Sequence, residues 1–413
     1  MTAPASAGIL DRILDRVRPS DIADGLAIAI AVSLPWSTSI TSALLVVWVL
    51  ALWPTVRPGE LARSLAHPAA GLPIVLWALG MVGMLWSEAT VAEQLFALKG
   101  FHKLLVIPLL FIQFRRSDKG PRLLAAYLAS CTALLVVSWV LHFVPHPVWH
   151  LGPPGVPVKD YIVQSVEFLI CTFALGHLAI DAWRDVRRRT AIALAALAVL
   201  FIANVAFVAT GRTSMAAFPV LVLLFGAQRL GWKGTVGLVV GATLFAAAIW
   251  ASSPYLRERA FGVAEEIQDY KSEQAKNSAG FRLEFWKKSL TFVAEAPLAG
   301  HGIGSIPILF RHAAIGDRGI AASVTGNPHN LILEIAVQFG LIGTIVLFAM
   351  WMAHLMVFPG SGLTAWLGQG LVVQTIVGSL VLSYLLDFSN GWLYVLGVGV
   401  LAGMAQRERG ASP

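Results

Sequence analysis

The sequence Asn327-Pro328-His329-Asn330 marks the point at which a charged, water-compatible stretch, residues 253–328, gives way to apolar sequence. The rest of the chain is almost entirely apolar. Hydrophobic residues make up 57% of the 413 residues and charged residues only 13%, and the mean hydropathy is +0.73. Soluble domains carry about 25% charged residues. The composition therefore predicts a polytopic membrane protein with one long polar loop late in the chain.

The apolar runs are long enough to cross about 30 Å of hydrocarbon, and their continuous rather than alternating apolarity favours helices. We predict an all-α integral membrane protein with about 12 transmembrane helices. Their expected cores are 22–36, 39–53, 70–86, 101–114, 123–144, 163–183, 191–209, 214–228, 235–251, 329–356, 366–387 and 392–404. The expected domains are N-terminal transmembrane helices over 1–252, the large loop over 253–328 and C-terminal transmembrane helices over 329–413.

Basic residues predict the orientation, because Lys and Arg precede the first span and then fill every second connection. By the positive-inside rule both termini are cytoplasmic, and the large loop lies outside the cytoplasm. Much of the net charge of +7 then anchors the cytoplasmic face and gives no argument for nucleic acid. No removable signal peptide is evident in residues 1–20. Cys131 and Cys171 are expected to be small packing residues.

The large loop is expected to be folded. Residues 255–274 and 281–294 mix apolar and charged side chains at helical spacing, which predicts two surface helices. The stretch 297–306 predicts a glycine-rich turn. We expect the 255–275 helix to move as a lid and the second helix to stay docked through Phe285 and Trp286.

Two arginines are candidate anion ligands. Arg212 lies in a short polar break between two spans, where its planar guanidinium either binds a lipid phosphate or simply snorkels to the interface. Arg282 lies one turn before Trp286, and it either shares that anion or belongs to a solvated helix face. The turn Gly300-His301-Gly302-Ile303-Gly304 lacks the Lys-Ser/Thr of a nucleotide-binding loop, so we favour a structural role over anion contact.

His329 is the candidate general base. Asn327 is expected to cap the next helix and Pro328 to occupy its first turn, which would put His329 at the exposed amino end. The helix dipole and nearby arginines disfavour the imidazolium, and a neutral imidazole is what a general base requires. The alternative is a histidine that only bonds to the backbone.

Five further residues are candidate substrate ligands: Lys99, Lys103, Asp387, Glu334 and Asn330. The lysines flank the outer start of the fourth span and Asp387 the outer end of the eleventh. Charges at membrane depth are costly, so they mark either function or mutual pairing.

Hydrolytic and metal-dependent classes are disfavoured. The histidines form no pair at metal-ligand spacing with carboxylates, and the sequence contains neither Gly-x-Ser-x-Gly nor His-Glu-x-x-His. We expect no catalytic metal.

In this order, the motifs resemble the O-antigen ligase and polymerase family of bacterial envelopes. The resemblance rests on Gly211-Arg212-Thr213-Ser214, on Arg282 and Trp286 followed by Pro297-Leu298-x-Gly300-x-Gly302-x-Gly304, and on Pro328-His329-Asn330 leading to Glu334 and Gly340-Leu341-Ile342-Gly343. It covers 212–343 directly and implies a GT-C-like membrane fold in the bacterial inner membrane, with an active site facing the periplasm.

The resemblance also implies a reaction. A glycan carried on undecaprenyl pyrophosphate would be transferred to an acceptor hydroxyl with inversion and without cofactor or metal. Arg212 and Arg282 would hold the pyrophosphate and stabilise the leaving group, and His329 would take the acceptor proton. The implied partners are an undecaprenyl-pyrophosphate-linked O-antigen donor, a lipid A-core acceptor and membrane lipids, with no nucleic acid.

Within the family we favour the O-antigen ligase, a glycosyltransferase, because the moderate length and single large late loop suit it. An O-antigen polymerase would use another lipid-linked glycan as acceptor, and a protein O-oligosaccharyltransferase a Ser or Thr of a protein. From another class, a transporter of lipid-linked glycan would use the same cations, and His329 would then be dispensable.

Overall fold

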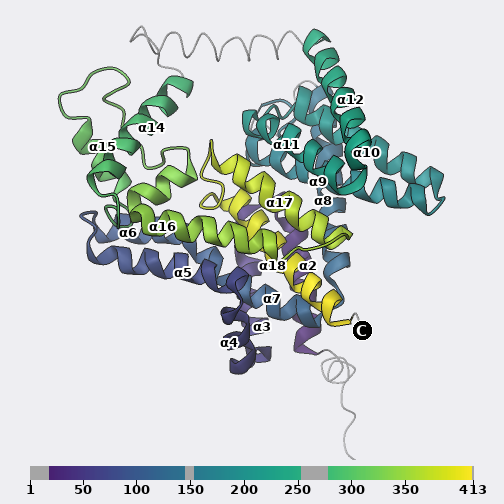
Figure 1. Cartoon of the computed structure of the whole chain (residues 1–413), viewed down its shortest axis with the longest axis horizontal. Coiled ribbons are helices and arrows are strands. Elements are labelled where there is room, and N and C mark those ends of the chain that lie inside the picture. Colours follow the sequence, from purple (N-terminus) through teal and green to yellow (C-terminus); the bar gives the residue numbers. More distant parts are fainter. Residues whose placement is uncertain (1–17, 145–152, 253–277, 412–413) are drawn as a thin grey trace, which may run out of the picture.

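The computed structural model describes residues 18–144, 153–252 and 278–411, and the regular structure in those ranges is helical, which confirms the all-α prediction (Figure 1). The expected lid over 255–275 lies outside the described residues. The helices are α2 (Pro19–Ser33), α3 (Thr38–Leu52), η1 (Trp53–Thr55), α4 (Pro58–Ala66), α5 (Pro68–Val82), η2 (Gly83–Leu85), α6 (Val91–Phe101), η3 (His102–Val106), α7 (Ile107–Arg116), α8 (Gly120–Phe143), α9 (Tyr161–Arg184), α10 (Arg188–Phe207), α11 (Arg212–Arg229), α12 (Gly231–Ser252), α14 (Ser278–Glu295), α15 (Ile306–Ala313), α16 (Leu331–Met356), α17 (Leu363–Ser379) and α18 (Phe388–Ala411).

Eight stretches among the described residues are helical, long and apolar enough to cross a membrane. They are Thr38–Thr55, Pro68–Leu85, Val91–Arg116, Gly120–Phe143, Tyr161–Arg184, Arg188–Phe207, Leu331–Met356 and Phe388–Gly410. The protein is therefore a multi-pass membrane protein. The other four expected spans coincide with helices α2, α11, α12 and α17.

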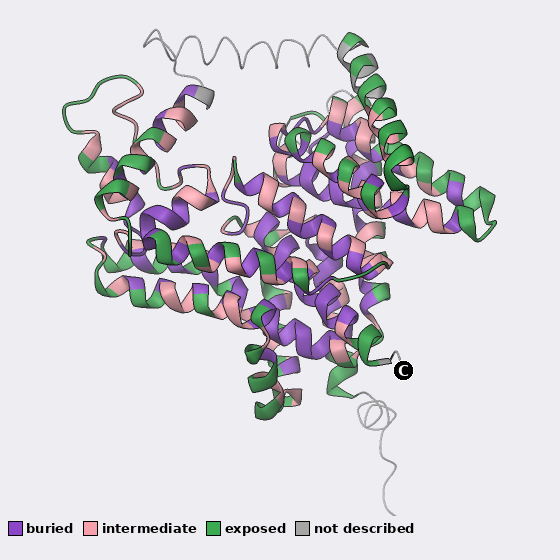
Figure 2. Cartoon of the chain, in the orientation of Figure 1, coloured by how far each residue is buried: buried purple, intermediate pink, exposed green. Residues whose placement is uncertain are grey.

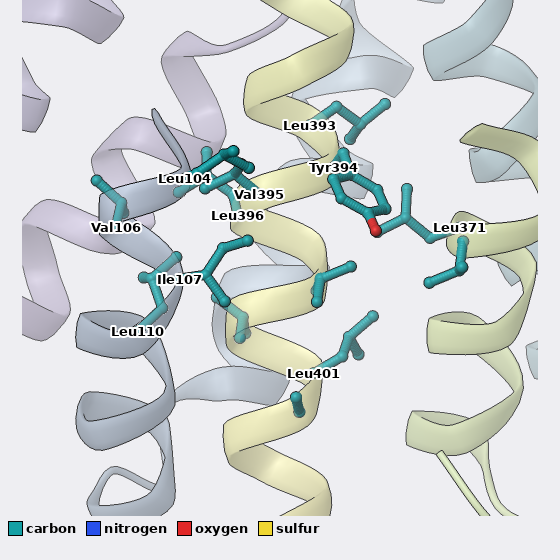
Figure 3. Packing of buried hydrophobic residues seen from close by; sticks show 14 of the residues in the cluster. Leu104, Val106, Ile107, Leu110, Leu371, Leu393, Tyr394, Val395, Leu396 and Leu401 are labelled. Atoms are coloured by element: carbon teal, nitrogen blue, oxygen red, sulfur yellow. The ribbon is translucent and has the colours of Figure 1, made fainter. Parts of the chain in front are cut away.

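The core is built around α18, the most buried of the eight stretches, 83% of whose most apolar window is buried. Leu104, Ile107 and Leu110 of η3 and α7 pack against its apolar side chains, while Tyr394 of α18 points toward α17 (Figure 3). Figure 2 shows buried residues concentrated in these central helices and exposed residues along α12. The apolar face of α12 therefore lies at the outside of the bundle.

The penultimate helix is shorter than the sequence predicts. The expected span 366–387 was wrong at its end, because α17 stops at Ser379. Side chains from elsewhere bind the carbonyl groups of the unwound segment 380–387: Asn330 Nδ2 donates to Leu380 O at 2.9 Å, and Lys103 Nζ donates to Leu386 O at 3.2 Å. These donors supply the bonds that a continued helix would have made internally.

Helix α16 is broken at Gly340, whose backbone has φ 59° and ψ −149°. The glycine-rich turn 297–304 fills the break. On one side the backbone N–H groups of His301 and Gly302 donate to Val337 O and Gln338 O, each at 2.9 Å. On the other side Leu341 N donates to Pro297 O at 2.8 Å, and Ile342 N donates to Leu298 O at 3.2 Å.

The turn continues to use its amides within the protein after it leaves α16. Ile303 N donates to Gly83 O at 3.3 Å, and Gly304 N donates to the side-chain oxygen of Gln338 at 2.9 Å. These bonds support the structural role over anion contact. Each unpaired backbone group in such surroundings would cost about 1–3 kcal/mol. The turn and the break therefore stabilise each other.

Gly300 provides a test of this interlock, the mutual hydrogen bonding between the turn 297–304 and the break in α16. Its φ is +65°, and an added Cβ would lie 2.5 Å from the backbone of Gln338 and Phe339. We expect Gly300→Ala to lower the free energy of unfolding by roughly 3 kcal/mol or more, because backbone cannot move aside. Thermal unfolding in detergent measures the change.

Gly316→Ala is the matched control. Gly316 also has a positive φ, +86°, but nothing lies within 4 Å of its added Cβ. Only the cost of left-handed backbone, about 1 kcal/mol, is expected. Equal losses in the two variants would contradict the interlock.

Candidate functional site

Helix α14 is docked against the start of α16 by an aromatic cluster. Phe285 and Phe292 of α14 both meet Phe310 of α15 edge-on, with ring centroids 5.5 Å and 5.2 Å apart, and Val337 of α16 completes the contact. Trp286 Nε1 also donates to Pro328 O at 3.0 Å. The predicted surface helix and its docking through Phe285 and Trp286 are thus confirmed.

His329 lies just before α16 rather than in its first turn. Asn330, not Asn327, caps the helix, because its Oδ1 accepts from Leu333 N at 3.1 Å. Asn327 Oδ1 instead accepts the backbone N–H of His329 at 2.7 Å. The expected capping pattern was therefore wrong by three residues, although His329 does lie at the amino end. Its backbone is left-handed, with φ 56°, which is uncommon for a residue other than Gly.

A hydroxyl from the segment 380–387 joins the residues around His329. Ser383 Oγ lies 2.9 Å from Asn327 Oδ1 and also contacts the carboxyl group of Glu334, a buried side chain one turn into α16. Asn327, in turn, holds the backbone of His329. The partner of Glu334 is therefore Ser383, and the hydroxyl couples Glu334 to the turn that carries His329.

The His329 ring is half-buried. It lies close to Phe285, and the positive charge of Arg282 acts on it. The two rings are stacked, with their centroids 6.4 Å apart and their planes inclined by 25°. Nδ1 of His329 is buried and has no hydrogen-bond partner among the described residues. Burial lowers the pKa of His329, and the charge of Arg282 lowers it further. The ring is therefore kept neutral near neutral pH.

Arg212 is the first residue of α11, and its neighbour Thr213 connects that helix to the same segment. Thr213 bonds to the hydroxyl of Tyr384, which follows Ser383 directly. Gly211 lets the start of α11 press against α9, since an added Cβ would lie 2.2 Å from Ser165 Oγ. The structure thus brings Arg282 close to His329 and links the start of α11 to that site through residues 383 and 384.

The other predicted ligands have varied surroundings. Lys103 is buried and bound to the carbonyls of Leu386 and Asp387, whereas Lys99 is exposed. Asp387 is exposed, and its Oδ1 accepts from Asn390 N at 2.9 Å. Asn330 uses both ends of its amide, on Leu380 and Leu333. Lys103 and Asn330 therefore hold the segment 380–387 in place.

Ser383 and Tyr384 were not predicted from the sequence. They fall in Leu382-Ser383-Tyr384-Leu385, which continues an apolar run and carries no motif. The only available signal was that two polar residues interrupt the expected eleventh span near its outer end.

Comparison with known protein families gives a match to one region of the chain. Residues 196–348 match the family model described as "O-Antigen ligase". The match includes Arg212, Arg282 and His329. This region, residues 196–348, is therefore similar to the O-antigen ligase family.

Individual relatives are distant. An uncharacterised protein of Haemophilus influenzae is 28% identical over 131 residues, which are 31% of this chain and 33% of that protein. The match thus spans about a third of the relative's length. A chain of the solved structure described as "Structural coordination of polymerization and crosslinking by a peptidoglycan synthase complex" has a TM-score of 0.43 and 16% identity, and the similarity covers 83% of this chain and 98% of that chain. That TM-score is too low to carry an inference.

The effect of Arg282 on His329 is testable. We expect Arg282→Gln to raise the pKa of His329 toward its ordinary value, because the burial remains but the neighbouring charge is removed. Only neutral imidazole reacts with diethyl pyrocarbonate, so the midpoint of His329 modification should move to higher pH. Mass spectrometry of the modified peptide measures it.

Lys287→Gln is the control, since Lys287 is exposed on the same helix and its removal also deletes one charge. Its midpoint should match that of the unsubstituted protein. An unchanged midpoint in Arg282→Gln would contradict the conclusion that the charge of Arg282 lowers the pKa of His329.

Proposed function

We propose that the protein is an O-antigen ligase, which transfers O-antigen from undecaprenyl pyrophosphate to a sugar hydroxyl of lipid A-core. The observation that carries the proposal is the environment of His329: a half-buried ring beside Phe285, with a pKa lowered by burial and by Arg282, on a backbone fixed by Asn327. The family match supports a ligase or polymerase type of activity. The choice of ligase, donor and acceptor is our inference.

The reaction is a single displacement. Nε2 of neutral His329 accepts the proton of the acceptor hydroxyl, whose oxygen forms a bond to the anomeric carbon of the donor glycan. The bond between that carbon and the pyrophosphate oxygen breaks, and undecaprenyl pyrophosphate leaves with the electron pair. The configuration at the anomeric carbon is inverted. For Nε2 to act in this way, the hydrogen of the neutral ring must reside on Nδ1.

The two arginines have the complementary role in this proposal. Arg282 and Arg212 bind the pyrophosphate through their planar donor groups and stabilise the charge that develops on the leaving oxygens. The lowered pKa of His329 fits this arrangement, because the cation that favours the anion also keeps the base unprotonated.

The membrane arrangement is part of the proposal. We infer about 12 spanning helices of GT-C-like type in the bacterial inner membrane, with both termini cytoplasmic and the site facing the periplasm. Eight helices meet the length and apolarity of a span, and four others coincide with the remaining expected spans.

The role of His329 is tested with purified protein, lipid-linked donor and lipid A-core acceptor. We expect His329→Ala to lower the transfer rate by at least about 100-fold, as is typical for loss of a general base. His329→Asn tolerates the left-handed backbone and should be equally inactive but fully folded. Full transfer activity in His329→Asn would refute the base. Absence of transfer in the unsubstituted protein, with lipid-linked donor still bound in an arginine-dependent way, would instead favour a transporter. Loss of transfer on adding a chelator would contradict the metal-free mechanism.

Lipopolysaccharide from a deletion strain separates the two activities of the family. Loss of the whole O-antigen ladder, with polymerised glycan retained on its lipid carrier, is expected for a ligase. A core that bears a single repeat would instead identify a polymerase.

Ser383 is proposed as a positioning residue. We expect Ser383→Ala to lower kcat about tenfold with little change in KM, because the loss of one hydrogen bond costs about 1–1.5 kcal/mol and loosens Asn327, which holds His329. In a His329→Ala background the same substitution should have no further effect.

Ser379→Ala is the matched control. Ser379 is a buried serine near the same segment, and its hydroxyl has no partner among the described residues. Its kcat should be unchanged. Equal losses in the two variants, or a loss confined to KM, would contradict the positioning role.

A further inference from the structure

A second polar cavity lies at the far end of α16 from His329. His354, in the last turn of that helix, bonds through Nε2 to Ala69 O at 2.8 Å, and His67 is two residues from Ala69. His329 precedes the first residue of the 26-residue α16, and His354 lies near its last, so the two histidines are at opposite ends of this helix. Residues of α4 line the cavity beside His67, and Figure 1 shows α4 at the other end of the bundle from α14.

This cavity has a volume of about 280 Å³, and three arginines from three helices line it: Arg63 of α4, Arg115 of α7 and Arg409 of α18. Within the described ranges, no carboxylate lies within ion-pair distance of any of the three. Of the nearby acids, Glu60 pairs with Arg116, and Glu408 accepts from Thr364 at 2.6 Å. Among the described residues, the cavity thus concentrates three guanidinium groups without a carboxylate in direct contact with them.

His67 adds a neutral donor to these cations. Its Nδ1 accepts from Ala69 N at 3.3 Å, so the hydrogen of the neutral ring resides on Nε2. Burial lowers the pKa of His67, and the charge of Arg409 lowers it further. Ser64, which is buried and donates to Pro108 O at 3.3 Å, ties α4 to α7 below the arginines.

The shape and position of the cavity favour a lipid over a soluble anion. A single water needs only about 15 Å³, so 280 Å³ leaves room for a whole headgroup. Phe111 and Ile112 form an apolar wall and belong to the candidate span Val91–Arg116, so the cavity opens where membrane helices end. Guanidinium groups match phosphate oxygens bidentately.

We propose that this arginine cavity is a binding site for the phosphate headgroup of an anionic phospholipid, on the face opposite the active site. The phosphate would be bound by Arg63, Arg115 and Arg409. Occupation offsets part of the clustered positive charge and joins α4, α7 and α18 at one membrane surface.

The test uses phosphatidylglycerol and native mass spectrometry of the full chain in detergent. We expect the triple variant Arg63→Ala/Arg115→Ala/Arg409→Ala to bind phosphatidylglycerol at least roughly tenfold more weakly than the unsubstituted protein. The control Arg187→Ala/Arg188→Ala/Arg189→Ala removes the same charge from exposed positions at the start of α10 and should retain the lipid. Equal losses of phosphatidylglycerol binding in both variants would mean that the lipid is attracted by overall positive charge and not by this cavity. That result would overturn the proposal.

A second variant guards against misfolding. Gln406 also lines the cavity, and Gln406→Glu leaves every arginine in place. We expect it to weaken phosphatidylglycerol binding and to raise the thermal midpoint without lipid, because the new carboxylate competes for the same guanidinium groups. Unchanged lipid binding would overturn the proposal. Inorganic phosphate binding at micromolar Kd, lost in the triple variant, would assign the cavity to a soluble anion instead.

Discussion

The rest of the structure depends on one backbone exchange, in which the turn 297–304 bonds to α16 where that helix breaks at Gly340. In apolar surroundings every N–H and C=O group must find a partner, and a broken helix leaves several without one. The turn supplies them and has its own groups satisfied in return. These hydrogen bonds therefore fix the backbone geometry at the break. That geometry sets the direction of the first half of α16 and of the turn that carries His329. Since the same turn follows α14 directly, it also fixes where the aromatic cluster of Phe285, Phe292 and Phe310 can dock.

The candidate site is assembled from elements that are far apart in the sequence. Arg282 comes from α14, His329 from the entry to α16, and Ser383 from the unwound segment after α17. Carbonyl groups of that segment accept hydrogen bonds from Lys103 and Asn330, two of the predicted substrate ligands. A charge at membrane depth is costly, and Lys103 shows that the cost can be met by backbone carbonyls rather than by a ligand or an acid. The presence of a charged residue in an expected span is therefore not enough to predict whether that residue binds substrate or stabilises the fold.

Much of the architecture could be predicted from the sequence, because long apolar runs and the helical spacing around Phe285 and Trp286 report local geometry directly. The cap at Asn330, the end of α17 and the break at Gly340 could not. Asn327 and Asn330 are equally good caps, and only the left-handed turn at His329 decides between them. The stretch around Gly340 is continuously apolar, and its break becomes stable only because an earlier turn provides the missing bonds. Ser383 was missed for the same reason, since its partners are distant in the sequence: Asn327 precedes α16 and Glu334 lies in that helix.

The origin of Ser383 in the last interhelical segment has a consequence for how the protein is made. Chains leave the ribosome from the amino end, so α14, α16 and His329 are synthesised before residues 380–387 and α18. Until then Glu334 lacks its hydroxyl partner, and α18, around which the core packs, is absent. A nascent chain inserted up to α16 would thus hold its arginines and histidine in the membrane without a finished site. The contacts of Ser383 with Asn327 and Glu334 can therefore form only after the last interhelical segment has been synthesised.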